Sequence, residues 1–162
     1  YGETQALIQE EVQVEKLPMD AEIKEWKITY ADAAAYDPLY PDWTVFDNEK
    51  RVQKLYNIVR EQPRYAGFVK YETELEFEEG DYEIDLGYVG EDAVLYIDGK
   101  RIGERIHPPY RFVYAAEGAS HILEIVTTSH LGYKMADHFS SYLSMQPVGL
   151  LGPVTICKLQ KK

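Results

Sequence analysis

Short runs of alternating apolar and polar residues, separated by turn-forming residues, constrain this chain more than any other feature. Residues 68–77 place apolar side chains on one face and Lys or Glu side chains on the other, the pattern of a half-buried antiparallel strand. A turn is expected at Glu79-Gly80-Asp81. Further strands are expected over residues 82–86, 110–114, 121–127 and 153–159. Regularly spaced short strands with turns between them indicate a β-sandwich or barrel.

The strongest local signal is a β-hairpin in the last third of the chain. Residues 93–97 and 100–102 are apolar runs joined by Asp98-Gly99. Asp-Gly favours the two-residue turn that joins antiparallel strands, because both residues tolerate positive φ. A Gly149-Leu150-Leu151-Gly152-Pro153 turn is expected to lead into the last strand.

Two segments depart from the strand pattern. Residues 48–60 carry Val52, Leu55, Tyr56 and Val59 at helical spacing, which predicts a short helix capped by Asp47 or Asn48. Residues 31–47 are loop-like. We therefore predict an all-β fold with at most one or two short helices, divided into a lead-in segment or linker over 1–25 that packs on a β-sandwich domain over 26–162.

The composition of the chain excludes some classes of binding partner. The 162 residues suit one domain and carry a net charge of -11, so nucleic acids and anionic membranes are poor partners. No apolar run approaches the ~18 residues of a membrane-spanning helix. The chain opens Tyr1-Gly2-Glu3, which we interpret as a piece of a longer protein or a processed product. Cys157 has no partner for an internal disulfide and is expected to be a small core or sheet residue.

A set of ordered motifs points to a family. The motifs are Trp26–Ile28, Tyr65–Glu72, Asp81–Gly87, Asp98–Lys100, Pro108–Phe112 and Gly149–Val154. In this order and spacing they resemble the sugar-binding jelly-roll domain of family-two glycoside hydrolases, as in β-galactosidase and rhamnosidase-like proteins. The resemblance implies a galactose-binding-domain-like jelly roll. Asp98-Gly99 stands where the family usually has Asn-Gly, and serves the same turn.

The resemblance also implies a role. The chain would be a non-catalytic accessory domain of a carbohydrate-active protein, binding a glycan weakly or bracing a catalytic domain. No catalysis is expected from the chain alone, because the family's catalytic carboxylates lie in a separate barrel of about 250 residues. One alternative is a structural or interaction module without ligand. The other is a contributor of loops to a composite glycosidase active site. In β-galactosidases the corresponding loop can supply an acid and a tryptophan to the neighbouring active site, but residues 137–147 contain no tryptophan.

Aromatic side chains are the richest binding resource, because the C–H faces of a sugar stack on rings. Loop residues Tyr40, Trp43 and Tyr65 form a candidate platform, with Arg64 and His107 as candidate hydroxyl partners. The commoner role of such rings is packing under loops or against a neighbouring domain. The many carboxylates, such as Glu72, Glu74 and Glu76, occupy alternating outward positions and are expected to form a solvated face.

No cofactor is expected, and one structural calcium ion is kept as a candidate. Clustered oxygens for it exist at Glu78, Glu79 and Asp81, and at Glu91 and Asp92. The expected partners are a carbohydrate or the neighbouring catalytic domain of the same protein. If that protein degrades saccharides in a bacterium, a periplasmic, cell-surface or secreted location is favoured.

Overall fold

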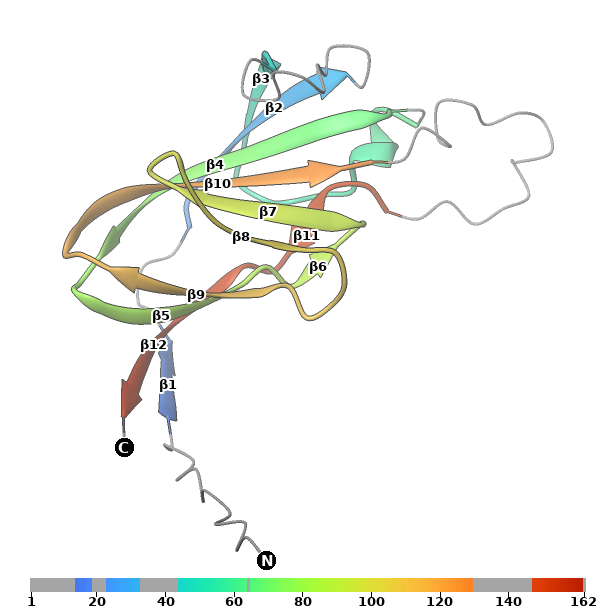
Figure 1. Ribbon diagram of the computed structural model, residues 1–162. Helices are drawn as coiled ribbons and strands as arrows, with labels where there is room; N and C mark the ends of the chain where they lie inside the picture. The colour runs from blue at the N-terminus through green and yellow to red at the C-terminus, as the bar shows by residue number, and fades with distance from the viewer. Residues whose placement is uncertain (1–13, 19–22, 33–43, 64, 130–146, 162) are drawn as a thin grey trace, which may run out of the picture.

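The protein is an antiparallel β-sandwich, as Figure 1 shows. The computed structural model describes residues 14–18, 23–32, 44–63, 65–129 and 147–161. Its strands are β1 (Val14–Pro18), β2 (Trp26–Asp32), β3 (Asp47–Val52), β4 (Gly67–Phe77), β5 (Gly80–Asp85), β6 (Tyr88–Val89), β7 (Asp92–Ile97), β8 (Lys100–Arg105), β9 (Arg111–Ala116), β10 (Ala119–Thr128), β11 (Leu150–Gly152) and β12 (Thr155–Lys161). The expected all-β class is confirmed.

Two main sheets enclose the core. One has the order β3-β2-β4-β10-β7-β8 and the other β1-β12-β5-β9, while β6 and β11 form a short third ladder. Because side chains alternate along a strand, β4 buries Val69, Tyr71 and Phe77 and turns Lys70 and Glu72 outward. The predicted alternation over 68–77 is therefore confirmed.

The core is continuous between the two sheets. The six-stranded sheet contributes Ile28, Tyr71, Leu95, Leu123 and Ile125, and the four-stranded sheet contributes Tyr82, Ile84, Phe112 and Ile156. Trp26 opens β2 and is buried, with its ring edge-on to that of Tyr71. Each large apolar side chain buried in this way stabilises the fold by about 1.5–3 kcal/mol.

The Asp98-Gly99 hairpin forms as expected between β7 and β8. Asp98 has φ 51° and Gly99 has φ 78°, the two positive values of a type I′ turn. The turn is also tied to β10. Asp98 N–H donates to Ile122 O at 2.9 Å, and Ile122 N–H donates to Asp98 Oδ1 at 2.8 Å.

The prediction of a short helix over residues 48–60 is wrong. Residues 47–52 form β3, an edge strand that pairs with β2, and a single 3-10 turn covers Ile58–Arg60. The apolar residues at helical spacing still pack against the core, Val52 from the end of β3 and Leu55, Tyr56 and Val59 from the segment that follows. Asn57 holds this segment, because its Oδ1 accepts from Val59 N–H at 3.1 Å and from Val148 N–H at 3.0 Å. Tertiary pairing has overridden the local pattern.

The Gly149–Pro153 segment is more than the expected turn. Leu150–Gly152 forms β11, which pairs with β6, and a turn leads from it into β12. Leu150 N–H donates to the hydroxyl of the buried Tyr71 at 3.0 Å. Pairing with a distant two-residue strand is not visible in the local sequence.

The lead-in segment contains β1, which pairs with β12 alone. Its side chains are exposed except for the half-buried Leu17. The boundary between this segment and the sandwich at residue 25 stays a prediction.

Cys157 lies in β12 and is half-buried, as expected for a sheet residue. In the described part of the chain, no helix is long and apolar enough to span a bilayer.

Candidate functional site

Two of the five predicted binding residues are described by the structure. Tyr40, Trp43 and Arg64 lie outside the described residues. Tyr65 precedes β4, and His107 lies in the connection from β8 to β9. The predicted platform as a whole stays a prediction.

Tyr65 is held by the fold. Its hydroxyl lies 2.9 Å from Ala31 O and 2.6 Å from Phe68 O, and its ring is edge-on to Tyr30 at 5.6 Å between centroids. Burial raises the pKa of its hydroxyl well above the ordinary value. These contacts give Tyr65 the packing role that is common for loop aromatics.

His107 is exposed, and the sheet register places it toward the same end of the sandwich as Tyr65. The strands next to these residues are β4 and β8, with β10 and β7 between them. Three strand spacings amount to about 14 Å. One small ligand could therefore not readily contact both residues.

A different site lies on the outer face of the six-stranded sheet, opposite the core. We call it the sheet-face hollow, and its volume is about 440 Å³. Its lining is Thr44, Phe46, Phe68, Lys70, Asp92, Val94, Tyr96, Gly99, Glu104, Glu124, Val126 and Thr128. Volumes of about 300–1,000 Å³ are usual for small-molecule sites.

The antiparallel register places this lining in rows across the sheet. Lys70 lies opposite Val126, which lies opposite Val94. In the next row Glu124 lies opposite Tyr96 and also opposite Glu72. The hollow is therefore built from outward side chains of β4, β10 and β7, whose positions are fixed by backbone pairing.

Two lysines compensate a repulsive pair in this register. Glu72 and Glu124 are directly opposite each other, and like charges in that position are destabilising. Lys27 Nζ lies 3.3 Å from Glu72 Oε2, and Lys70 Nζ lies 3.9 Å from Glu124 Oε2. Lys70 Nζ also lies 4.1 Å from the centroid of the Phe46 ring, a cation–π contact. Lys70 is thus fixed between a carboxylate and a ring.

The hollow also contains an unsatisfied hydroxyl. Thr44 Oγ1 is buried and, within the described part of the chain, has no hydrogen-bond partner. A buried polar atom without a partner costs about 1–3 kcal/mol.

The lining combines rings, apolar side chains and polar groups. Phe46, Phe68 and Tyr96 supply rings, whereas Lys70 and Glu124 supply a donor and acceptors. A saccharide presents the matching chemistry, with apolar C–H faces and hydroxyls that both donate and accept. The arrangement can bind such a molecule.

The hollow was not predicted from the sequence, although one signal for it exists. The run from Ala93 to Ile97 is apolar on both faces, because Val94 and Tyr96 alternate outward between the core residues. A strand with one solvated face should be polar at those positions. Such a run indicates that the outer face is partly covered or binds something.

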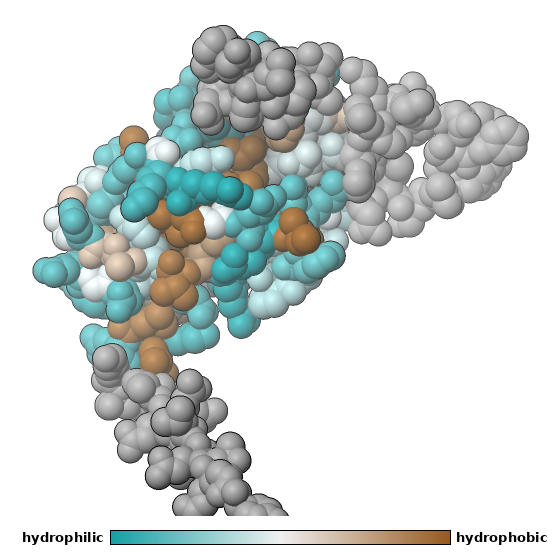
Figure 2. All heavy atoms as spheres, viewed as in Figure 1, coloured by the Kyte–Doolittle hydropathy of each residue, from teal (hydrophilic) through white to brown (hydrophobic). Residues whose placement is uncertain are grey.

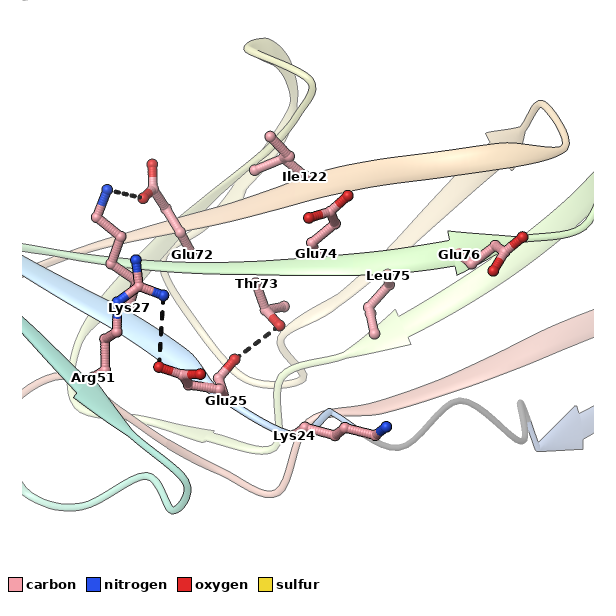
Figure 3. A pocket seen from close by; sticks show the side chains of 10 residues that line it. All are labelled: Lys24, Glu25, Lys27, Arg51, Glu72, Thr73, Glu74, Leu75, Glu76 and Ile122. Atoms are coloured by element: carbon pink, nitrogen blue, oxygen red, sulfur yellow. Dashed lines mark hydrogen bonds and ion pairs between the residues drawn. The ribbon is translucent and has the colours of Figure 1, made fainter.

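A second hollow, of about 900 Å³, lies where β2 begins and β4 continues past it (Figure 3). Its side chains form ion pairs, Lys27 with Glu72 and Arg51 with Glu25. Glu74 and Glu76 point outward from β4 and are exposed. It has no aromatic lining residue among those described. This surface is the solvated carboxylate face that the sequence predicted.

Two of the five carboxylates considered for calcium have structural contacts. Glu78 Oε2 lies 3.2 Å from Lys158 Nζ, and Asp92 Oδ1 accepts from Thr128 N–H at 3.0 Å. Within the described ranges, no group of three or more His, Cys, Asp or Glu side chains is arranged to hold a metal ion. The calcium ion stays a prediction.

Solved structures share this fold. The rhamnosidase from Novosphingobium sp. PP1Y aligns with a TM-score of 0.68 at 17% identity, over 88% of this chain and 15% of that one. The GH2 β-galacturonidase from Eisenbergiella tayi aligns at 0.55 and 15% identity, over 90% and 24%. The Faecalibacterium prausnitzii β-glucuronidase aligns at 0.55 and 12% identity, over 92% and 32%.

These matches confirm the expected resemblance at the level of the fold. The chain spans between 15% and 32% of the length of the three enzymes, so its fold corresponds to one part of each of these larger enzymes. No protein-family model and no curated protein sequence matches it.

Proposed function

We propose that the chain is a non-catalytic accessory domain of a larger glycosidase, and that it binds a glycan in the sheet-face hollow. The observation that carries the proposal is the lining of that hollow, which combines aromatic rings with the Lys70–Glu124 ion pair. The fold shared with domains of glycosidases supports the context. Fold alone does not determine function, so the proposal depends on the lining.

Binding is expected to be weak. The hollow is open, and a sugar would make few contacts there. We expect dissociation constants between about 1 mM and tens of μM, or roughly -4 to -6 kcal/mol. Such affinity is useful when it holds a neighbouring catalytic domain near a polymeric substrate.

The test is a glycan panel followed by calorimetric titration of the parent and three variants. Tyr96→Ala removes a ring from the hollow and should weaken binding by about tenfold or more. Tyr88→Ala is the matched control, because Tyr88 is 50% exposed on β6 and does not line the hollow. Trp43→Ala tests the loop platform. Loss of binding in Trp43→Ala with Tyr96→Ala unaffected would contradict the hollow as the site.

Bracing of a catalytic domain is the second candidate. A groove of about 700 Å³ beside β12 is lined by apolar side chains, among them Ile23, Leu55, Leu151 and Val154. Figure 2 shows further hydrophobic patches on an otherwise hydrophilic face, and Ile106 and Val113 are more than 60% exposed. A folded parent domain that binds no glycan would favour this role.

A further inference from the structure

We infer that the sheet-face hollow selects uncharged sugars over uronic acids, and that Glu124 is the residue that sets this selection. The inference rests on the proposed glycan binding and adds the charge class of the ligand. It follows from the charges that the lining carries and from the contacts that already occupy them.

The charges of the lining are unequal. Among its described lining residues, the hollow presents three carboxylates, Asp92, Glu104 and Glu124, and one cation, Lys70. Outside the lining, Arg101 forms an ion pair with Glu104. A uronic acid differs from the corresponding neutral hexose by a carboxylate in place of a hydroxymethyl group. It would bring a negative charge toward this lining, whereas a neutral sugar would offer hydroxyl donors to the same oxygens.

Lys70 is not available to a ligand carboxylate, because its charge is already paired with Glu124. Its ammonium lies 3.9 Å from the Glu124 carboxylate and 4.1 Å from the centroid of the Phe46 ring. Both side chains of the ion pair are about one-fifth exposed, so water screens the pair only in part. An incoming carboxylate would have to compete with Glu124 for Lys70.

The other two carboxylates are held in place. Asp92 Oδ1 accepts from the Thr128 backbone N–H at 3.0 Å, and Glu104 Oε2 accepts from Arg101 Nη2 at 2.7 Å. Removing Glu124 is therefore the change that frees a cation inside the hollow. Glu124→Gln keeps the shape of the side chain and leaves Lys70 available to a ligand carboxylate.

The structure supplies a matched control. Glu72 lies directly opposite Glu124 in the register of β4 and β10. It pairs with Lys27 at 3.3 Å, and it is not part of the lining of the hollow. Glu72→Gln removes the same charge from the same sheet face without releasing Lys70.

The experiment measures galactose and galacturonic acid binding by NMR titration of the parent, Glu124→Gln and Glu72→Gln. The parent and Glu72→Gln should bind galactose at least tenfold tighter than galacturonic acid, and Glu124→Gln should reduce that ratio about tenfold. Raising the salt concentration should narrow the ratio in the parent, because exposed charges are screened.

The outcomes separate the two proposals. Equal or tighter binding of galacturonic acid by the parent would overturn the selection for uncharged sugars and leave glycan binding intact. An unchanged ratio in Glu124→Gln, or the same change in Glu72→Gln, would overturn the role of Glu124. If the folded parent binds neither these sugars nor any glycan of the panel, the proposed function itself fails, and the inference fails with it.

Discussion

His121 is the residue whose surroundings determine its charge most clearly. It is buried on β10, with its ring edge-on to Phe77 and Tyr114. Nε2 lies 2.8 Å from Glu117 O, and Nδ1 lies 2.5 Å from Asp98 Oδ2. Both partners accept hydrogen bonds, so both ring nitrogens must donate and the imidazole carries a proton on each. The Glu117 carbonyl and the Asp98 carboxylate raise the pKa of His121 accordingly.

This contact makes stability depend on pH in a defined direction. A raised pKa means that the His121 contribution is complete below the unfolded value of about 6.5 and is lost as pH rises through the folded pKa. The Ile122 N–H and His121 lower the pKa of Asp98, so its contribution is present above about 3.9 and is lost as pH falls through the folded pKa. The pair stabilises the hairpin most between about pH 4 and 6.5.

Asp98→Asn should lower the pKa of His121 without destroying the turn. Asparagine suits the turn, and its amide can donate to a neutral imidazole while the Glu117 carbonyl still accepts from Nε2. The titration of the His121 ring protons, followed by NMR, should move toward lower pH. Glu104→Gln, on the same hairpin, should leave it unchanged. An identical His121 titration in parent and Asp98→Asn would show that the contact does not form in solution.

Substituting two glycines, one in a turn and one beside β11, distinguishes the cost of backbone strain from the cost of steric crowding. Gly99 has φ 78° and open space where a Cβ would lie, whereas Gly149 has φ 91° and a Cβ there would meet the Tyr71 hydroxyl and Ile58. Gly99→Ala should lower the free energy of unfolding by about 1–2 kcal/mol, from strain alone. Gly149→Ala should lower the free energy of unfolding by about 1–3 kcal/mol more than Gly99→Ala does, because the added methyl group is also crowded. Urea unfolding measures both, and equal costs would contradict the close packing of Gly149 on Tyr71.

The β1 strand should be dispensable for folding. Among the described strands it pairs with β12 alone, it adds one ion pair to β5 between Lys16 and Glu83 at 2.9 Å, and it exposes most of its side chains. A chain beginning at Ile23 should lose about 1–2 kcal/mol, equivalent to roughly 2–8 °C in Tm. Circular dichroism should still show β-structure that melts cooperatively. A truncated chain that does not fold would contradict the predicted division of the chain at residue 25.

The elements that could be predicted from sequence are those specified by local signals. The Asp98-Gly99 turn and the alternation along β4 involve neighbouring residues, so both were correctly predicted. The helix over residues 48–60 was not, because β3 exists through its pairing with β2, whose residues lie about twenty positions earlier. β11 likewise depends on β6, about sixty positions away.

The candidate site was harder to predict than the fold, because its residues come together only in the folded sandwich. The ordered motifs that indicated a glycosidase-type domain can be read directly from the sequence, and the comparison with solved structures confirmed the resemblance in fold. The sheet-face hollow joins Phe46, Lys70, Tyr96 and Glu124 from segments far apart in sequence. The register of β4, β10 and β7 makes Lys70, Tyr96 and Glu124 neighbours, and the Phe46 ring joins them through its contact with Lys70.

Glycan binding is proposed on the outer face of the six-stranded sheet. Amide NMR spectra of the isotopically labelled parent, recorded during titration with a glycan that binds, test it directly. We predict shift changes that cluster at Lys70, Val94, Tyr96 and Val126. Changes confined to Tyr65 and His107, or to the groove around Leu55 and Val154, would contradict the claim.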